Sequence, residues 1–296
     1  MTRPRAGGDD VCGIGGALRF APGAADGVAE GVAEIERSLR LVARRGPDDA
    51  GVWSDGRHCV LGFRRLAVLD LSSAGHQPLV TPDGRYALVC NGEVYNFREL
   101  GMRLAREGVQ LHSTGDAEVV LHALALWGVE ALRAFNGMFA LAFYDVERRR
   151  LLLARDHAGM KPLYLRRGRD GVAFGSQYDQ LAAHRWLEAG PVDAGSLALY
   201  LRFDYIPAPY ALHAGTSMVE AGAWIAIDAD GGETRGRFHD FPVGRVPDLR
   251  GEEACDAVDE AVARAVRRHL VSDVPVGTFL SGGIDSPLVA ACAQAT

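Results

Sequence analysis

Hydrophobic residues are spaced along the chain in two ways, and each way predicts its own kind of element. From Val32 to Val42 the apolar positions recur every three to four residues, which predicts a helix that ends before Gly46 and Pro47. Similar patterns predict helices over residues 116–127, 252–270 and 284–295. Short apolar runs predict strands over residues 14–20, 60–71, 86–90, 138–144, 151–155, 172–174 and 274–280.

The order of these elements indicates the fold class. Strands and helices do not alternate regularly over the first 200 or so residues, which favours an α+β fold of two antiparallel sheets layered with helices. Gly and Pro residues then predict many turns, and with them a domain boundary, around residues 210–250. The strand, glycine turn and helix that follow make one unit of a parallel α/β domain. Because this unit cannot cover both faces of its strand, we expect it to be loosely ordered or to pack its helix on the first domain.

Composition narrows the function classes. The chain has 296 residues, of which 48% are hydrophobic and 24% charged, which is ordinary for about two globular domains. A net charge of -6 argues against a nucleic-acid partner. No apolar run approaches the roughly 18 residues that would span a membrane, and no apolar segment follows Arg3 and Arg5 to make a secretory signal.

The cysteines indicate a reducing compartment, so we expect a cytoplasmic protein. Their number is odd, their spacing is wide and no Cys-x-x-Cys pair occurs, which argues against a disulfide framework and a zinc site. We therefore predict no bound metal in the first domain, and we expect most cysteines to act as small buried apolar residues. The five are Cys12, Cys59, Cys90, Cys255 and Cys292.

A glycine-rich segment near residue 280 has the composition of a phosphate cradle. Glycines let main-chain N–H groups approach an anion, and the N-terminus of the following helix adds positive potential. The segment lacks the lysine of a Walker loop and resembles the pyrophosphate loop of ATP pyrophosphatases. The residues that the resemblance assigns to ATP binding are Leu280, Ser281, Gly282, Gly283, Asp285 and Ser286.

An ordered set of motifs runs through the first 160 residues. These are Cys12-Gly13-Ile14-Gly15-Gly16, Arg44-Arg45-Gly46-Pro47-Asp48-Asp49, Leu61-Gly62-Phe63-Arg64-Arg65-Leu66-Ala67-Val68-Leu69-Asp70, Ala74-Gly75-His76-Gln77-Pro78, Cys90-Asn91-Gly92-Glu93-Val94-Tyr95-Asn96, Ser113-Thr114-Gly115-Asp116-Ala117-Glu118, Phe135-Asn136-Gly137-Met138-Phe139-Ala140 and Ala154-Arg155-Asp156. Together they resemble the class II glutamine amidotransferase domain of glutamine-hydrolysing asparagine synthetases.

The resemblance implies a domain plan. Residues 1–11 would be a disordered leader or a mis-assigned start. Residues 12–225 would form the amidotransferase domain, a four-layer αββα fold of the N-terminal nucleophile (Ntn) hydrolases. Residues 226–249 would be a linker, and residues 250–296 an incomplete, Rossmann-like ATP-pyrophosphatase domain.

The same resemblance assigns roles in the glutaminase site. Cys12 would be the nucleophile, with its own α-amino group as the base, because amide hydrolysis needs a strong nucleophile and a proton acceptor. The Asn91 side chain and the Gly92 main-chain N–H would bind the oxyanion of the intermediate. Arg65 would bind the carboxylate of glutamine, and Asp116, assisted by Glu93, its ammonium group.

Arg65, Asp116 and His76 also have ordinary structural interpretations. Arg65 could be a surface arginine at a strand edge, and Asp116 could cap a helix. We read His76 as a hydrogen-bonded structural histidine, since this chemistry needs no histidine.

The chain departs from the family pattern at both ends. Cys12 is not the first residue after the initiator, so its amine is free only if the leader is cleaved or if translation starts at Val11, since GUG, one of the valine codons, can also initiate. The chain ends at Thr296, shortly after the glycine segment, so we expect the synthetase half to be incomplete.

The predicted function is glutamine hydrolysis that supplies ammonia to an aspartate adenylated by ATP with Mg²⁺. A homodimer is compatible with this function. Three alternatives stay open. One is an amidotransferase of a natural-product pathway that aminates another carboxylate. Another is a relative of β-lactam synthetases or lasso-peptide cyclases, although these tend to lose the nucleophilic cysteine. The last is a non-catalytic remnant.

Overall fold

The computed structural model describes residues 11–21, 25–241 and 248–295, so the predicted leader lies outside the described residues except for Val11. The helices are α1 (Ala25–Leu41), α2 (Phe97–Arg106), α3 (Asp116–Trp127), α4 (Ala131–Ala134), α5 (Ala194–Phe203), α6 (Glu252–His269) and α7 (Asp285–Gln294). The strands are β1 (Gly13–Arg19), β2 (Asp49–Ser54), β3 (Cys59–Arg65), β4 (Leu79–Val80), β5 (Tyr86–Val94), β6 (Gly137–Asp145), β7 (Arg150–Arg155), β8 (Tyr164–Arg167), β9 (Gly171–Gly175), β10 (Thr216–Met218), β11 (Ala223–Asp228) and β12 (Glu233–Arg237).

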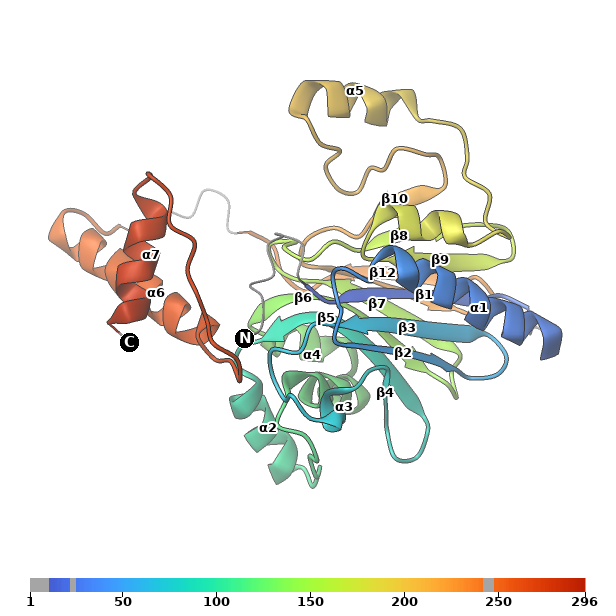
Figure 1. The fold of residues 1–296 in the computed structure, drawn as a ribbon, viewed down its shortest axis with the longest axis horizontal. Helices are drawn as coiled ribbons and strands as arrows, with labels where there is room; N and C mark the ends of the chain where they lie inside the picture. Colours follow the sequence, from blue (N-terminus) through green and yellow to red (C-terminus); the bar gives the residue numbers. More distant parts are fainter. Residues whose placement is uncertain (1–10, 22–24, 242–247, 296) are drawn as a thin grey trace, which may run out of the picture.

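The strands form two six-stranded sheets, which lie face to face (Figure 1). One sheet has the order β10-β8-β9-β1-β3-β2, and the other has the order β12-β11-β7-β6-β5-β4. Every pairing between these strands is antiparallel, so the predicted α+β class with two antiparallel sheets is confirmed.

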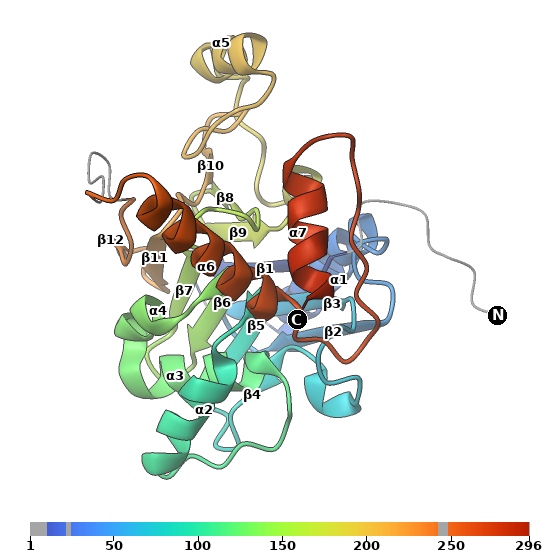
Figure 2. The same ribbon diagram turned by 90° about the vertical axis from the view of Figure 1, so that its left-hand side faces the viewer.

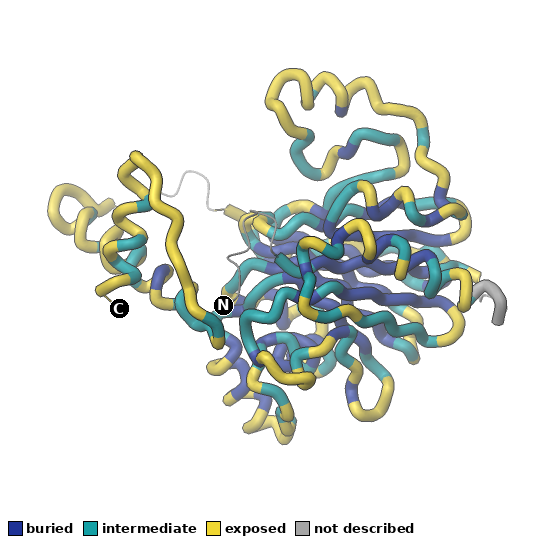
Figure 3. The backbone as a smooth tube through the Cα atoms, viewed as in Figure 1, coloured by how far each residue is buried: buried dark blue, intermediate teal, exposed yellow. Residues whose placement is uncertain are grey.

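Side-chain alternation along the strands builds the layers. In β5, Ala87 and Val89 face the core between the sheets, whereas Leu88 and Cys90 face the outer side, where α2, α3 and α4 pack. On the outer side of the other sheet, apolar residues of α1 such as Ile35 form a third cluster. The order of layers is therefore helix, sheet, sheet, helix, as predicted, and the burial pattern in Figure 3 follows the two sheets.

Two predicted strands differ in the structure. The strand predicted over residues 60–71 ends at Arg65, and the chain then forms a loop. The strand predicted over residues 274–280 was wrong: this described segment is extended but pairs with no described strand, and most of it is exposed. A strand is stabilised by hydrogen bonds to a neighbour, and no neighbour lies here.

The sheet also continues past residue 225, where we expected the first domain to end. That position lies inside β11, which pairs with β7 on one side and β12 on the other. The paired strands therefore run to Arg237, within the stretch predicted to be a linker.

Helices α6 and α7 lie beside the sheets and not over a sheet face (Figures 1 and 2). The end of α6 nevertheless touches the first domain: Val271 packs against the helix-side core, and the ring of His269 lies 4.3 Å from that of Tyr95. The C-terminal end of α6 and the segment after it thus contact the first domain, whereas most residues of α6 are exposed. Across the described residues, no helix is both long enough and apolar enough to cross a membrane.

Candidate active site

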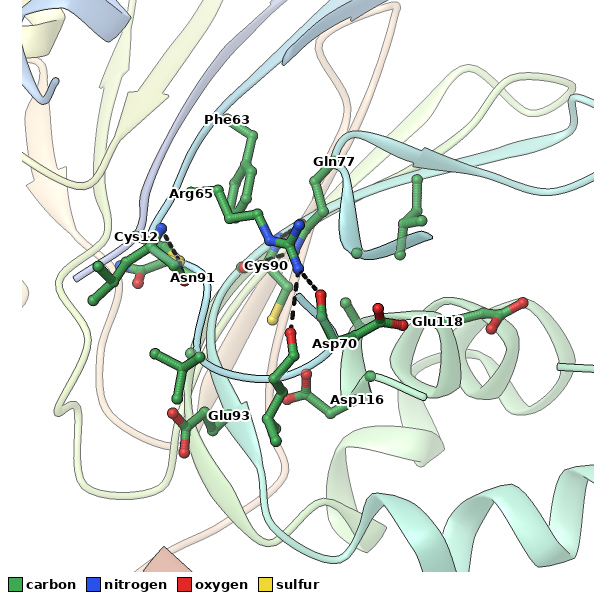
Figure 4. Close-up of a pocket in the computed structure, with 18 of the residues that line it drawn as sticks. Cys12, Phe63, Arg65, Asp70, Gln77, Cys90, Asn91, Glu93, Asp116 and Glu118 are labelled. Atoms are coloured by element: carbon green, nitrogen blue, oxygen red, sulfur yellow. Dashed lines mark hydrogen bonds between the residues drawn. The ribbon is translucent and has the colours of Figure 1, made fainter. Parts of the chain in front are cut away.

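A cavity of about 250 Å³ opens where β1 begins and where β3 and β5 end, near the start of α3. The fold thus gathers residues from Val11 to Lys161 around one cavity (Figure 4). All six residues predicted for the glutaminase site line it, and these are Cys12, Arg65, Asn91, Gly92, Glu93 and Asp116.

Cys12 stands directly before β1, at the wall of the cavity. Its Sγ accepts a hydrogen bond from the main-chain N–H of Leu66 at 3.4 Å and lies 3.6 Å from the Leu66 carbonyl oxygen. Burial raises the pKa of the thiol, while the Leu66 main chain and the positive charge of Lys161 act in the opposite direction. The thiol is therefore held in place, and its ionisation depends on nearby cations.

Asn91 and Gly92 lie on β5, in the register that pairs them with Ala140 and Phe139 of β6. The Asn91 side chain is 1% exposed, and its Nδ2 donates to no atom among the described residues. At Gly92 a Cβ would overlap the main-chain carbonyl of Met138, so the close approach of β6 demands glycine there. The site thus contains a buried amide donor that is not used inside the fold.

Arg65 ends β3 and is buried, which rules out the reading of a surface arginine. Its guanidinium donates to the carbonyl oxygens of Ser72 at 3.0 Å and Leu69 at 3.2 Å, and also to that of Asp70. These bonds use at most three of the five N–H groups of a guanidinium. They orient a permanent positive charge at the cavity wall.

Asp116 is the first residue of α3, so the cap position belongs to Gly115 and the reading of Asp116 as a helix cap is wrong. One carboxylate oxygen accepts from the main-chain N–H of Val94 at 2.7 Å. Burial is the main cause that raises the pKa of Asp116 to about 6, and the nearby Glu93 adds to it. At neutral pH the cavity therefore holds an anion opposite in charge to Arg65.

Asp70 has a part in the site that the sequence did not reveal. It lies in the loop after β3 with a left-handed backbone (φ 51°), and its carboxylate accepts from the main-chain N–H groups of Thr114 at 2.9 Å and Ser72 at 3.1 Å. It therefore ties the loop that holds Arg65 to the loop that leads into Asp116. Its place in the motif beside Arg65 was the only available signal.

Lys161 is the second residue that sequence reasoning missed. It lines the cavity, and burial lowers the pKa of its ammonium group, whereas the charges of Glu93 and Cys12 raise it. The carboxylate of Asp156 accepts from the main-chain N–H groups of Lys161 at 3.0 Å and Met160 at 2.9 Å, which fixes the preceding turn. Glu93 has a pKa raised by burial, and Lys161 acts against that rise.

His76 does not line the cavity. Its Nδ1 lies 2.6 Å from a carboxylate oxygen of Asp49, so the prediction of a hydrogen-bonded histidine is confirmed. Within the described ranges, no group of three or more His, Cys, Asp or Glu residues could hold a metal ion.

The glycine segment forms a small local structure before α7. The main-chain N–H of Ser281 donates to Oγ of Ser286 at 2.8 Å, and that of Gly283 donates to Oγ of Ser281 at 3.3 Å. Leu280 and residues 281–285 are exposed. The turn and the helix N-terminus at Asp285 are therefore present, but the described residues build no enclosed pocket around them.

The glutamine amidotransferase domain family matches residues 11–239, and the asparagine synthase family matches residues 257–296. The chain belongs to the glutamine amidotransferase domain family. Asparagine synthetase [glutamine-hydrolyzing] 1 of Bacillus subtilis is 35% identical over 263 residues, which cover 88% of this chain and 40% of the relative. Asparagine synthetase [glutamine-hydrolyzing] 3 of the same organism is 34% identical over 269 residues, covering 88% of this chain and 42% of the relative.

A relative from Mycobacterium tuberculosis that carries an asparagine synthetase name is 36% identical over 302 residues, covering 96% of this chain and 46% of the relative. The chain thus spans less than half the length of these curated relatives. Among solved structures, the glutamine phosphoribosylpyrophosphate amidotransferase of B. subtilis aligns with a TM-score of 0.54 at 17% identity, covering 96% of this chain and 64% of that one. This likeness supports the Ntn-hydrolase fold.

Proposed function

We propose that the cavity binds glutamine and that Cys12 hydrolyses its side-chain amide to glutamate and ammonia. The observation that carries this proposal is the unpaired, buried Asn91 amide in the wall that also holds the Cys12 thiol. An amide donor beside a nucleophile is what the oxyanion of an acyl-transfer intermediate requires. Arg65 and Asp116 supply one charge of each sign for the α-carboxylate and the α-ammonium group of the substrate.

The reaction divides into two steps. Sγ of Cys12 attacks the amide carbon while the α-amino group of Cys12 takes the thiol proton, and the oxyanion is bound by Asn91 Nδ2 and the Gly92 N–H. The C–N bond breaks as that proton passes to the leaving group, which departs as ammonia and leaves a thioester. Water then attacks the thioester, which releases glutamate and restores the thiol.

The free amine gives the sharpest test. We expect protein that begins at Cys12 to release glutamate from glutamine, and protein that retains residues 1–11 to release none, with each N-terminus verified by mass spectrometry. Equal activity from a verified, uncleaved long form would contradict the role of the amine. No activity from either form would contradict the proposed function.

We further propose that the ammonia serves a synthetase reaction in which ATP, with Mg²⁺, adenylates aspartate to make asparagine. The names of the relatives and the match of residues 257–296 to the asparagine synthase family support this acceptor over the alternatives. In that reaction the turn from Leu280 to Ser286 would bind the pyrophosphate of ATP. Pyrophosphate release that depends on aspartate, measured on a form that contains the whole synthetase domain, would test it.

A further inference from the structure

The segment after α6 makes a second contact with the first domain, on the loop that holds Arg65. The main-chain N–H of Asp273 donates to the carbonyl oxygen of Val68 at 3.0 Å. In return, Oδ2 of Asp273 accepts from the main-chain N–H of Asp70 at 2.7 Å, across 203 positions of sequence. Two hydrogen bonds in opposite directions fix both the distance and the orientation of the loop relative to this residue.

Asp70 connects Asp273 to Arg65 at the wall of the glutamine cavity. Its N–H is bound by Asp273, and its carbonyl oxygen accepts from the guanidinium of Arg65. Its backbone is left-handed, a conformation that a residue with a side chain keeps only where surrounding contacts hold it. The acceptor on Asp273 therefore helps to fix the peptide between Leu69 and Asp70, and the carbonyl of Leu69 also accepts from Arg65.

We propose that Asp273 is a positioning residue for the glutamine site, which holds the turn at Val68–Asp70 in the conformation that aims Arg65 into the cavity. This inference rests on the proposed function, in which Arg65 binds the α-carboxylate of glutamine. That carboxylate does not react, so it is bound alike in the ground state and the transition state. A misplaced Arg65 therefore raises KM and leaves kcat nearly unchanged.

The contact also couples two parts of the chain. If the docked Asp273 strengthens glutamine binding, bound glutamine must strengthen the docking by the same factor. Any ligand or movement that withdraws the segment after α6 then lowers the affinity for glutamine.

The experiment uses the chain beginning at Cys12 and measures glutamate release as a function of glutamine concentration. We expect Asp273→Ala to raise KM about five- to tenfold, the effect of one lost hydrogen bond of ordinary strength, with kcat within about twofold. Asp273→Asn keeps a side-chain carbonyl that accepts from Asp70, so it should restore KM to near the unsubstituted value. Asp259→Ala, which removes an exposed carboxylate from α6, is the matched control and should change neither constant.

A second measurement separates positioning from loss of structure. In a Cys12→Ala background, calorimetry should show weaker glutamine binding for Asp273→Ala by the same five- to tenfold factor, with an unchanged melting temperature. Asp273 is exposed, so its substitution leaves no cavity in the core. Equal KM and equal affinity for Asp273→Ala and Asp259→Ala would overturn the inference. Failure of the unsubstituted chain to bind or hydrolyse glutamine would overturn the proposed function instead.

Discussion

The cavity around Cys12 and the turn over residues 281–286 differ in how many parts of the chain build them. The cavity receives walls from the residues before β1, from β3, β5 and the start of α3, and from Lys161. The turn is held by hydrogen bonds among Ser281, Gly283 and Ser286, within six positions of sequence, and it is exposed. Burial by distant segments raises the pKa values of Cys12, Glu93 and Asp116, and groups perturbed in this way cluster at functional sites.

The largest effect in the cavity is expected from substitution of the nucleophile. Replacing Cys12 by Ala should lower kcat for glutamine hydrolysis by about 10⁴-fold or more, because the proposed nucleophile is gone and burial raises the pKa of Cys90, another thiol that lines the cavity, well above its usual value. Glutamate release from the chain beginning at this position checks it, with an unchanged melting temperature as the control. Substantial residual turnover would point to a different nucleophile.

The oxyanion donor should have the next largest effect. We expect Asn91→Ala to lower kcat by about 10²–10³-fold, the loss usual for one such donor, while KM changes little. Steady-state kinetics on the chain beginning at Cys12 provide the measurement. A rise in KM with unchanged kcat would mean that Asn91 binds glutamine and not the transition state.

The raised pKa of Asp116 predicts a pH dependence. Above about pH 6 the carboxylate is ionised and can pair with the ammonium group of glutamine, whereas below it the neutral acid cannot. We expect kcat/KM to fall about tenfold per pH unit below that pKa, since kcat/KM follows the free enzyme. In Asp116→Asn, kcat/KM should be low throughout and this acid limb should vanish. If the fall in kcat/KM at low pH persists in Asp116→Asn, another group causes it.

Lys161 should have a smaller effect, through the charge it places near the thiol. Lys161→Met removes a cation that lowers the pKa of Cys12, so the thiolate fraction at neutral pH should fall about three- to tenfold. The rate of iodoacetamide alkylation as a function of pH measures this directly. Lys161→Arg retains the charge and serves as the control, and identical pH profiles for Met and Arg would exclude the electrostatic role.

The smallest effects are expected at the exposed turn. Ser281→Ala should leave glutamine hydrolysis unchanged, and calorimetry with ATP and Mg²⁺ should show no binding at millimolar concentration, because no described residues enclose an adenine or ribose there. Clear micromolar binding would show that the turn is a working nucleotide site by itself, and the contrast drawn here would fail.

The first domain could be predicted in its layers and in its site because the signals are local. The order of strands and helices indicated two antiparallel sheets, and the resemblance of the ordered motifs to the amidotransferase family assigned the six site residues, which all line the cavity. The strand over residues 274–280 could not be judged in this way. An apolar run forms a strand only where another strand lies beside it, and the residues of the run do not show whether such a neighbour exists.

Contacts across long sequence distances escaped prediction for the same reason. Lys161 reaches the cavity because Asp156 folds the turn before it, and Asp273 reaches Asp70 because α6 ends against the first domain. Asp273 is one of many carboxylates of the chain, and although Lys161 is its only lysine, residue type alone does not show that either lies at the site. Only the fold makes them neighbours of the site.

The unpaired amide of Asn91 also has a consequence for the stability of the protein. A buried donor without a partner costs about 1–3 kcal/mol of the free energy of unfolding, and this one is shielded from water. The fold is therefore less stable with an empty cavity than its packing would allow. A ligand oxygen that accepts from this amide would stabilise the folded protein by part of that amount and raise the melting temperature. An apolar residue of similar volume at position 91 would stabilise the protein without a ligand, with a loss of activity.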